Sequence, residues 1–243
     1  ETYISENSPC FVIAEAGVNH NGDLDNGIKL IDIASEAGAD AVKFQTFKAS
    51  KIATVNTPKS TYHIETTGTD EVQSWHDLLV SQELSFEQHI ALMEHAKKKN
   101  IIFLSTPYDE SSVDLLKDIK VNLIKVASSD TNNHKLLSHI AATKIPVILS
   151  TAMANPAEIK ESCEVLKKGG CDDLVVLQCT GNYPSKLEDM NLNSMKHLRK
   201  ISNCLVGFSD HSTSVSTGSI AVAAGAKVFE KHFTISRNMK GPD

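Results

Sequence analysis

The sequence predicts an α/β fold, a single TIM (β/α)8 barrel. Short apolar runs rich in Val, Ile and Phe alternate with longer segments whose apolar residues recur at helical spacing, which is typical of repeated βα units. About eight such units follow one another along the chain. The chain has 243 residues, of which 41% are hydrophobic. That is enough for one large core, and single barrels commonly have this length.

Each unit begins with an apolar run that we expect to be a strand. The strands are expected at residues 11–15, 41–45, 101–105, 121–125, 146–150, 174–178, 205–209 and 227–231. The helices are expected at residues 24–36, 86–98, 110–118, 134–142, 156–168, 192–199 and 214–224. Gly38 and Gly170 follow two of these helices, at positions where glycine suits the left-handed conformation that ends a helix.

Residues 50–85 interrupt this rhythm. The segment is polar and rich in Thr, and it contains Tyr62, His63, Trp75 and His76. We expect a long loop with a short helix, folded over one end of the barrel. No linker divides the chain, so residues 1–243 are expected to form one catalytic domain.

An open doubly wound sheet is the alternative α/β architecture. It favours a glycine-rich GxGxxG turn after the first strand. Residues 16–22 read AGVNHNG instead, so the sequence favours the barrel.

The composition argues against several classes of function. The formal net charge is −6, which argues against nucleic acid or an anionic membrane as the main partner. No apolar stretch approaches the roughly 18 residues that span a bilayer, and the N-terminus has no secretory pattern. The five cysteines show no CxxC spacing, which is typical of reduced thiols in a cytoplasmic protein.

The carboxyl ends of the strands carry polar side chains, and active sites of TIM barrels lie at these ends. The residues at these ends are Glu15, Lys43, Gln45, Ser105, Thr106, Lys125, Ser150, Thr151, Gln178, Cys179, Thr180, Ser209, Asp210, His211, Glu230, Lys231 and His232. We therefore expect a reactive site at one rim of the barrel.

His211 and His232 follow neighbouring strands. Neutral imidazoles are common ligands of divalent metals, and two of them leave coordination positions open, as a catalytic metal requires. The alternative is that each is an ordinary hydrogen-bonded histidine.

Lys43 and Lys125 each end an apolar strand. Such a lysine can hold an anion or form a Schiff base, and two together favour binding of phosphate plus carboxylate. The alternative is a lysine that merely extends from the rim into solvent. Hydroxyls that would complete an anion cradle belong to Thr106, Ser128, Ser150 and Ser209.

Two carboxylates are further candidates. Glu15 could act as a base or orient a substrate, or it could form a salt bridge to a rim lysine. Asp130 could equally be the N-cap of the helix that begins near His134. The residues alone thus indicate a barrel enzyme that handles a phosphorylated or carboxylated small molecule with a divalent metal.

Several stretches of the sequence, taken in order, resemble the sialic acid synthase family. The matching stretches are IAEAGVNHNGDLDNGIKLIDIASEAGADAVKFQTF, FLSTPYDESSVDLL, IKVASSDTNNHKLL, ILSTAM, LQCTGNYP, GFSDHS, EKHFT and GPD. Members condense phosphoenolpyruvate with an open-chain acylamino sugar to give a nine-carbon 2-keto acid, with release of phosphate. Known products are N-acetylneuraminic, legionaminic and pseudaminic acids, and relatives serve spore-coat polysaccharide synthesis.

The resemblance also implies roles for single residues. His211 and His232 resemble the protein ligands of a catalytic Mn²⁺ or Mg²⁺, and Asp243 resembles an acid that reaches the metal through water. Glu15, Gln45 and Tyr183 resemble groups that position the sugar aldehyde or the attacking water. The phosphoenolpyruvate cradle would consist of Lys43, Thr106, Lys125, Ser128, Ser150 and Ser209.

The implied mechanism is a metal-assisted condensation. The metal polarises the aldehyde oxygen, and C3 of phosphoenolpyruvate attacks the carbonyl carbon. Water then adds at C2, and phosphate leaves by C–O cleavage while the lysines stabilise the shifting charge.

This chain departs from the family pattern on the sugar side. Many members carry SGE where residues 128–130 read SSD, so the catalytic acid Asp130 is one methylene shorter. Some have Asn directly after CT, where this chain has Gly181 and then Asn182. Both changes leave the identity of the acceptor sugar open.

Two other functions are alternatives to the synthase. The rivals are a metal-independent Schiff-base aldolase using Lys125 or Lys43, and a non-catalytic barrel that binds sugar or phosphate.

Residues 233–243 are too few for a covering helix, so an uncovered apolar face including Val228 is expected. We therefore expect a last helix beyond Asp243. The family resemblance implies that an antifreeze-like domain follows it and that the full-length protein is a homodimer.

Overall fold

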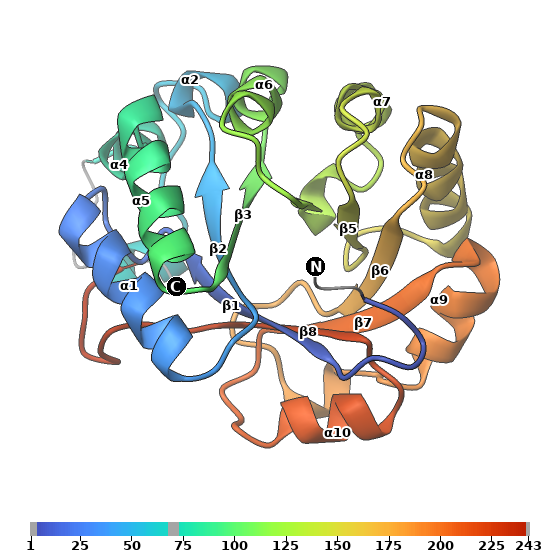
Figure 1. The fold of residues 1–243 in the computed structure, drawn as a ribbon. Helices are drawn as coiled ribbons and strands as arrows, with labels where there is room; N and C mark the ends of the chain where they lie inside the picture. The colour runs from blue at the N-terminus through green and yellow to red at the C-terminus, as the bar shows by residue number, and fades with distance from the viewer. Residues whose placement is uncertain (1–3, 68–72, 242–243) are drawn as a thin grey trace. The chain divides into compact units, whose positions relative to one another are not determined.

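The eight predicted strands form a closed parallel barrel. The computed structural model describes residues 4–67 and 73–241, and its strands hydrogen-bond in the order β1-β2-β3-β4-β5-β6-β7-β8 (Figure 1). The strands are β1 (Phe11–Gly17), β2 (Ala41–Thr46), β3 (Ile102–Pro107), β4 (Ile124–Val126), β5 (Val147–Ser150), β6 (Leu174–Cys179), β7 (Leu205–Asp210) and β8 (Val228–His232). The TIM-barrel prediction is confirmed.

The chain divides into two compact units. The first unit comprises Glu1–Ile13 and Val121–Lys231, and the second comprises Ala14–Lys120 and His232–Asp243. In the first unit, β4 to β8 pair in parallel with each successive neighbour. In the second unit, β2 pairs in parallel with β3.

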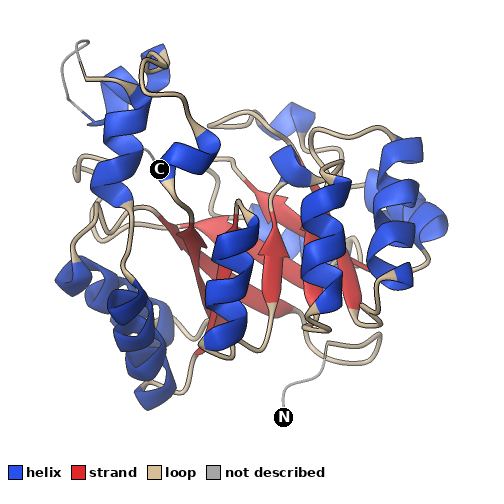
Figure 2. Cartoon of the chain, turned by 90° about the horizontal axis from the view of Figure 1, so that it is seen from above, coloured by secondary structure: helices blue, strands red, loops and turns tan. Residues whose placement is uncertain are grey.

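Helices alternate with the strands along the chain and are drawn in blue in Figure 2. They are α1 (Leu24–Glu36), α2 (Ala49–Ile52), α3 (Thr61–Thr67), α4 (Trp75–Gln82), α5 (Phe86–Lys98), α6 (Glu110–Asp118), α7 (His134–Ala142), α8 (Pro156–Lys168), α9 (Ser194–Ser202) and α10 (Thr217–Ala223), with 3-10 turns η1 (Ser128–Asp130) and η2 (Leu187–Asp189). Of the predicted helices, α1, α5, α6, α7 and α8 have the predicted ends, whereas α9 and α10 begin two and three residues later than expected.

Local capping chemistry explains why five helix boundaries could be predicted. Ser85 and Asn155 each accept a hydrogen bond from the helix they precede and form capping boxes with Gln88 and Glu158, an arrangement that satisfies two exposed amides. Gly38 and Gly170 have positive φ angles of 77° and 103°, as expected of helix ends.

The fourth strand is shorter than predicted. It begins at Ile124 and not at residue 121. Lys120 has a positive φ of 62°, which turns the chain after α6. Val121 and Leu123 are buried, so their apolar character reflects core packing without strand pairing.

The segment between β2 and α5 is more helical than predicted. It contains α2, α3 and α4, and Ser74 forms a capping box with Asp77 at the start of α4. A small hydrophobic cluster that includes Phe47 and Leu79 anchors it within the second unit, with Trp75 packed against it. Apolar side chains thus hold a segment whose overall composition is polar.

The prediction of an uncovered face at Val228 is wrong. Val228 is 0% exposed and lies two residues before Glu230, whose side chain bonds to Lys125 and Ser209. Side chains two apart in a strand share a face, so Val228 faces inward with Glu230. Phe229 takes the outer face, close to Gly218 of α10.

Across the described part of the chain, no helix is both long enough and apolar enough to cross a lipid bilayer.

Candidate active site

At the ends of β7 and β8, successive side chains point to opposite faces of the strands. Ser209 lies opposite Glu230, and Asp210 lies opposite Lys231. Ser209 donates a hydrogen bond to Glu230 at 2.8 Å. His211 follows Asp210, and His232 follows Lys231. Because successive side chains of a strand point to opposite faces, both histidines are expected on the same face as Ser209 and Glu230.

Asp210 and Lys231 have a structural role on the other face. The Lys231 Nζ lies 2.5 Å from Asp210 Oδ2, and Thr217 at the start of α10 also donates to this carboxylate. Burial alone would raise the pKa of Asp210, but Lys231, Thr217 and Ser212 together lower it. The pair therefore ties the last two strands to α10.

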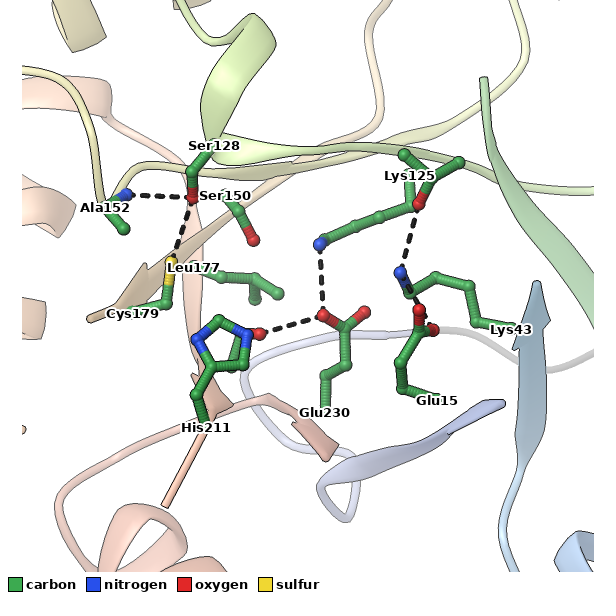
Figure 3. Close-up of polar contacts among 12 residues, drawn as sticks. Glu15, Lys43, Lys125, Ser128, Ser150, Ala152, Leu177, Cys179, His211 and Glu230 are labelled. Carbon is green, nitrogen blue, oxygen red and sulfur yellow. Dashed lines mark hydrogen bonds and ion pairs between the residues drawn. The ribbon is translucent and has the colours of Figure 1, made fainter. Parts of the chain in front are cut away.

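A first buried ion pair lies in the second unit. Lys43 of β2 places its Nζ 2.8 Å from Glu15 Oε2 of β1 and donates to Thr106 Oγ1 of β3 at 3.0 Å (Figure 3). All three side chains are buried. Buried charges are stable only when paired and hydrogen-bonded, so Glu15 holds the lysine at the strand ends. Both ideas about Glu15, a rim salt bridge and a place in the site, are compatible with this geometry.

A second buried ion pair lies in the first unit. Lys125 of β4 donates to Glu230 Oε1 of β8 at 3.0 Å, and Ser209 of β7 donates to the same oxygen (Figure 3). Lys125 and Glu230 are each 3% exposed. This arrangement repeats the lysine, carboxylate and hydroxyl set of the first pair.

Two serines of the first unit lie at neighbouring strand ends. Ser128 Oγ accepts a hydrogen bond from the Ala152 amide at 3.0 Å and lies 3.1 Å from Cys179 Sγ (Figure 3). Ser150 is 3% exposed, and its buried hydroxyl has no hydrogen-bond partner among the residues that the structure describes. A buried hydroxyl without a partner is costly, and a bound ligand would relieve that cost.

Tyr183 and His211 form a stacked pair in the first unit. Their ring centroids are 4.1 Å apart, and the Tyr183 hydroxyl lies 2.8 Å from His211 Nε2. His211 Nδ1 lies 2.7 Å from the Thr180 carbonyl oxygen, which can only accept, so Nδ1 carries a proton. In the neutral ring Nε2 then carries a lone pair, as a metal ligand needs, and here that lone pair faces the Tyr183 hydroxyl.

Asp243 and His232 are the other two predicted metal ligands. Asp243 lies outside the described residues, and His232 belongs to the second unit at the end of β8. Within residues 4–67 and 73–241, no group of three or more His, Cys, Asp or Glu side chains is placed to hold a metal ion. The metal assignment therefore stays a prediction.

Gln45 and Asp130 are the two other predicted site residues, and they lie in β2 and in η1. Gln45 of β2 is half-buried and lies opposite Thr106 of β3. Asp130 accepts hydrogen bonds from Asn133 and Ser129. The idea that Asp130 caps α7 is wrong, because Asn133 is the N-cap and accepts from the Leu136 amide.

Glu230 is the site residue that sequence reasoning left without a role. It stands two residues before His232 and therefore shares its face of β8. That spacing was visible in the sequence EKH. Its partner Lys125 lies 105 positions away along the chain, and no local pattern predicts that contact.

A buried polar layer in the second unit lies on the face of β2 and β3 opposite Lys43. Thr46 Oγ1 lies 2.9 Å from His89 Nε2 and 2.7 Å from Ser105 Oγ. His20 accepts from the Gly22 amide through Nδ1, and its ring lies 6.0 Å from that of Phe44. Burial, with a smaller contribution from His89, lowers the pKa of His20 from 6.5 to about 4. Burial also lowers the pKa of His89.

Comparison with protein families matches residues 30–243 to the NeuB family. The chain is 45% identical to N,N'-diacetyllegionaminic acid synthase of Campylobacter jejuni, over 96% of this chain and 70% of that protein. It is 34% identical to human N-acetylneuraminate-9-phosphate synthase, over 99% of this chain and 66% of that protein. The chain thus spans about two thirds of the length of these curated relatives.

A solved structure agrees with these sequence matches. The crystal structure of N-acetylneuraminic acid synthetase from Leptospira borgpetersenii in complex with citrate superposes with a TM-score of 0.84. The two sequences are 34% identical, and the match covers 97% of this chain and 76% of that one.

Proposed function

The chain belongs to the NeuB family, and from that premise we propose that it is a synthase of the sialic acid type. It joins phosphoenolpyruvate to an open-chain acylamino sugar, yields a nine-carbon 2-keto acid and releases phosphate. Residues 1–243 form its catalytic domain. The protein acts in the cytoplasm, and the full-length protein is a homodimer.

The two buried lysine–carboxylate pairs carry the proposal. Lys43 lies within β2 and Lys125 within β4. Both are at most 4% exposed, and a buried ammonium is costly unless it has a function or a partner. Phosphoenolpyruvate has two anionic groups, a carboxylate and a phosphate, and each lysine is suited by itself to bind one such anion. The buried hydroxyl of Ser150 and those of Thr106, Ser128 and Ser209 supply further donors.

The Schiff-base alternative fits this geometry poorly. A Schiff base requires a neutral lysine amine. Glu15 lies 2.8 Å from Lys43 and Glu230 lies 3.0 Å from Lys125, and an adjacent carboxylate favours the charged ammonium. Both lysines are therefore suited to anion binding and not to nucleophilic attack.

His211 fits a metal-binding role. The hydrogen bond from its Nδ1 to the Thr180 carbonyl oxygen fixes the tautomer, as backbone carbonyls do for metal-binding histidines. In this proposal His211 and His232 hold Mn²⁺ or Mg²⁺, and Asp243 contributes through water. When bound, the metal supplies Lewis-acid polarisation of the sugar aldehyde.

The chain's own residues divide the remaining tasks. The lysines hold the carboxylate and phosphate while charge shifts during condensation. Glu15, Gln45 and Asp130 orient the sugar and the water that adds at C2. Tyr183 contacts Nε2 of His211, so its hydroxyl competes with a metal for that nitrogen; in this proposal it positions the sugar once the metal is bound.

Phosphate release from a panel of acceptors tests the proposal. Full-length protein is mixed with phosphoenolpyruvate, Mn²⁺ and a set of 2-acetamido sugars, and inorganic phosphate is measured over time. At least one sugar should produce phosphate and an equimolar 2-keto acid.

The matched control for this assay is Ser138→Ala. Ser138 is exposed in α7, and its substitution should leave turnover unchanged, whereas Ser150→Ala should lower it. Absence of phosphate with every sugar, together with trapping of pyruvate on a lysine by borohydride, would favour the aldolase.

A further inference from the structure

Thr131 joins two residues of the first unit that come from neighbouring strand ends. It follows η1 directly and is 1% exposed. Its Oγ1 donates to the Ser128 carbonyl oxygen at 2.9 Å and to the Ser150 carbonyl oxygen at 2.7 Å. A hydroxyl has one proton and carbonyl oxygens only accept, so the two carbonyls share that proton. Thr131 therefore links the two serines whose hydroxyls were predicted to bind an anion.

The contact between Thr131 and Ser150 is not explained by local structure. A threonine hydroxyl often donates to the carbonyl three or four residues before it, and Thr131 makes such a bond to Ser128. Thr143 makes the same local bond to Ile140 at 2.7 Å. Ser150, however, is 19 residues from Thr131 and ends β5. The bond to Ser150 thus ties the chain after β4 to the end of β5.

Thr131 is itself held in place by α8. Ser162 of this helix is 0% exposed, and its Oγ donates to the Thr131 carbonyl oxygen at 2.5 Å. The Thr131 amide bonds the Ser128 carbonyl oxygen at 3.3 Å. The side chain of threonine is stiff because it branches at Cβ. A residue held at its amide and its carbonyl therefore presents its hydroxyl in a fixed position.

The backbone of Ser150 is held while its side chain makes no bond. Ser150 lies opposite Leu177 of β6, and the next residue, Thr151, donates to the Leu177 carbonyl oxygen at 2.9 Å. Thr131 occupies the Ser150 carbonyl. Within the described part of the chain, the buried Ser150 hydroxyl has no hydrogen-bond partner. Because the backbone cannot shift to provide one, the hydroxyl stays available to a ligand.

The Ser128 hydroxyl is also placed by its neighbours. Its Oγ accepts from the Ala152 amide at 3.0 Å and lies 3.1 Å from Cys179 Sγ (Figure 3). A thioether or thiol sulfur is a weak acceptor, so the Ser128 proton can turn from this sulfur to an anion at little cost. Thr131 fixes the carbonyl end of the same residue.

We propose that Thr131 is a positioning residue for phosphoenolpyruvate binding: it fixes Ser128 and Ser150 relative to each other before the ligand arrives. This inference rests on the proposed function, in which these two serines bind phosphoenolpyruvate. The Thr131 hydroxyl is used by the two carbonyls and does not contact the substrate. It improves affinity because hydroxyls that are already ordered lose less freedom on binding.

Calorimetric titration of full-length protein with phosphoenolpyruvate tests the role of Thr131. Thr131→Val removes the hydroxyl at nearly constant volume, and it should raise the Kd for phosphoenolpyruvate roughly 3- to 10-fold. Thr131→Ser keeps the hydroxyl and should bind as the parent protein does. Thr131→Ala removes the hydroxyl without placing a methyl group against the carbonyls, so it gives the same test should Thr131→Val fail to fold. An unchanged Kd in the folded variants that lack the hydroxyl would overturn the proposal.

Thr143→Val is the matched control. It removes a hydroxyl that makes only the local bond, at the end of α7. Both valine variants should lower the melting temperature, but only Thr131→Val should weaken phosphoenolpyruvate binding. An equal loss of affinity in Thr143→Val would show that Thr131 acts through general stability and would also overturn the proposal.

A double-mutant cycle shows whether Thr131 acts through Ser150. In the Ser150→Ala background, Thr131→Val should raise the Kd for phosphoenolpyruvate by a smaller factor than in the parent, because one of the two positioned hydroxyls is already absent. An effect of Thr131→Val that is equally large in both backgrounds would contradict action through this serine.

Turnover separates this inference from the proposed function. A parent protein that binds phosphoenolpyruvate but releases no phosphate with any sugar would refute the synthase, and the comparison of Kd values would still decide the role of Thr131. In a parent that turns over, an unchanged Kd in Thr131→Val would overturn the inference alone. A parent that does not bind phosphoenolpyruvate would overturn both.

Discussion

Glu230 accepts hydrogen bonds from Lys125 and Ser209 through one oxygen. Lys125 therefore has a structural role in addition to its proposed role in substrate binding. It neutralises a buried carboxylate, and in the proposed function it binds an anion of phosphoenolpyruvate. Substitution of Lys125 therefore has two effects that must be measured separately.

We predict that Lys125→Met raises the KM for phosphoenolpyruvate much more than that for the sugar. Loss of a charge-assisted contact costs roughly 2–3 kcal/mol, or about 30- to 150-fold. The substitution should also destabilise the fold by about 3–5 kcal/mol, because Glu230 is left buried without its cation. Steady-state kinetics and urea unfolding measure the two effects.

The double variant Lys125→Met/Glu230→Gln separates these effects. Removing the carboxylate charge should recover most of the lost stability, while the KM for phosphoenolpyruvate stays high. A change confined to the sugar KM would show that the two halves of the site are assigned the wrong way round.

A second residue-scale prediction concerns His211. His211→Ala should weaken Mn²⁺ binding by at least about 10- to 100-fold and abolish turnover, while the circular dichroism spectrum stays unchanged. His232→Ala should have the same effect. Isothermal titration with Mn²⁺ gives a readout that does not depend on activity.

Tyr183→Phe is the matched variant for this experiment. It keeps the ring that stacks on His211 but removes the hydroxyl at Nε2. Mn²⁺ binding should persist or strengthen, because the competing hydrogen bond is gone. Full turnover by His232→Ala in metal-free buffer would contradict the metal hypothesis.

At the scale of elements, His20 and His89 lie on the face of β2 and β3 opposite Lys43. They make the stability of the second unit sensitive to acid. His20 is fully buried, and its Nε2 finds no hydrogen-bond partner in the described part of the chain. Its pKa is lowered from 6.5 to about 4, so the folded state keeps it neutral where the unfolded chain binds a proton. Stability is therefore lost as pH falls from about 6.5 towards 4.

We predict a loss of about 2 kcal/mol in the free energy of unfolding between pH 7 and pH 5 from His20 alone. His89, whose pKa is also lowered, adds to the loss. Urea unfolding at the two pH values measures it. His20→Asn should reduce the pH dependence by that amount, whereas His197→Asn on the exposed surface of α9 should leave it unchanged. An equal pH dependence in His20→Asn and the parent would refute this account.

The contact between β7 and β8 depends on one glycine. A Cβ at Gly207 would lie 2.3 Å from the Val228 carbonyl oxygen and 2.7 Å from Leu177 Cδ2. The two strands could then not keep the register that pairs Ser209 with Glu230.

We predict that Gly207→Ala destabilises the protein by about 1–3 kcal/mol, as overpacking usually does, and raises the KM for phosphoenolpyruvate. Gly181→Ala is the control, because a Cβ there would make only ordinary contacts at 3.7 Å or more. Thermal unfolding of both variants decides the matter, and equal melting temperatures would contradict the close-packing argument.

At the scale of the whole molecule, the proposed metal serves the reaction and not the fold. Two histidine ligands leave coordination positions open, which is typical of catalytic and not of structural sites. We therefore predict that a chelator abolishes phosphate release while the melting temperature changes little. Added Mn²⁺ should restore turnover. Unfolding on chelation would point to a structural metal.

The sequence by itself determined the barrel, five of the helices to the residue, and the strand ends where polar groups gather. These features follow from local rules: apolar periodicity, capping residues such as Asn155, and glycines such as Gly38 with positive φ. Each rule acts over a few residues, so each can be recognised in the sequence.

Only the tertiary structure decided which rim residues act together. It paired Lys125 with Glu230, turned Asp210 and Lys231 to the outer face, and placed Val228 inside. It also gave the segment after β2 three helices on an apolar anchor. These outcomes depend on strand register between residues up to 105 positions apart. Register is set by packing across the barrel, which no short stretch of sequence encodes.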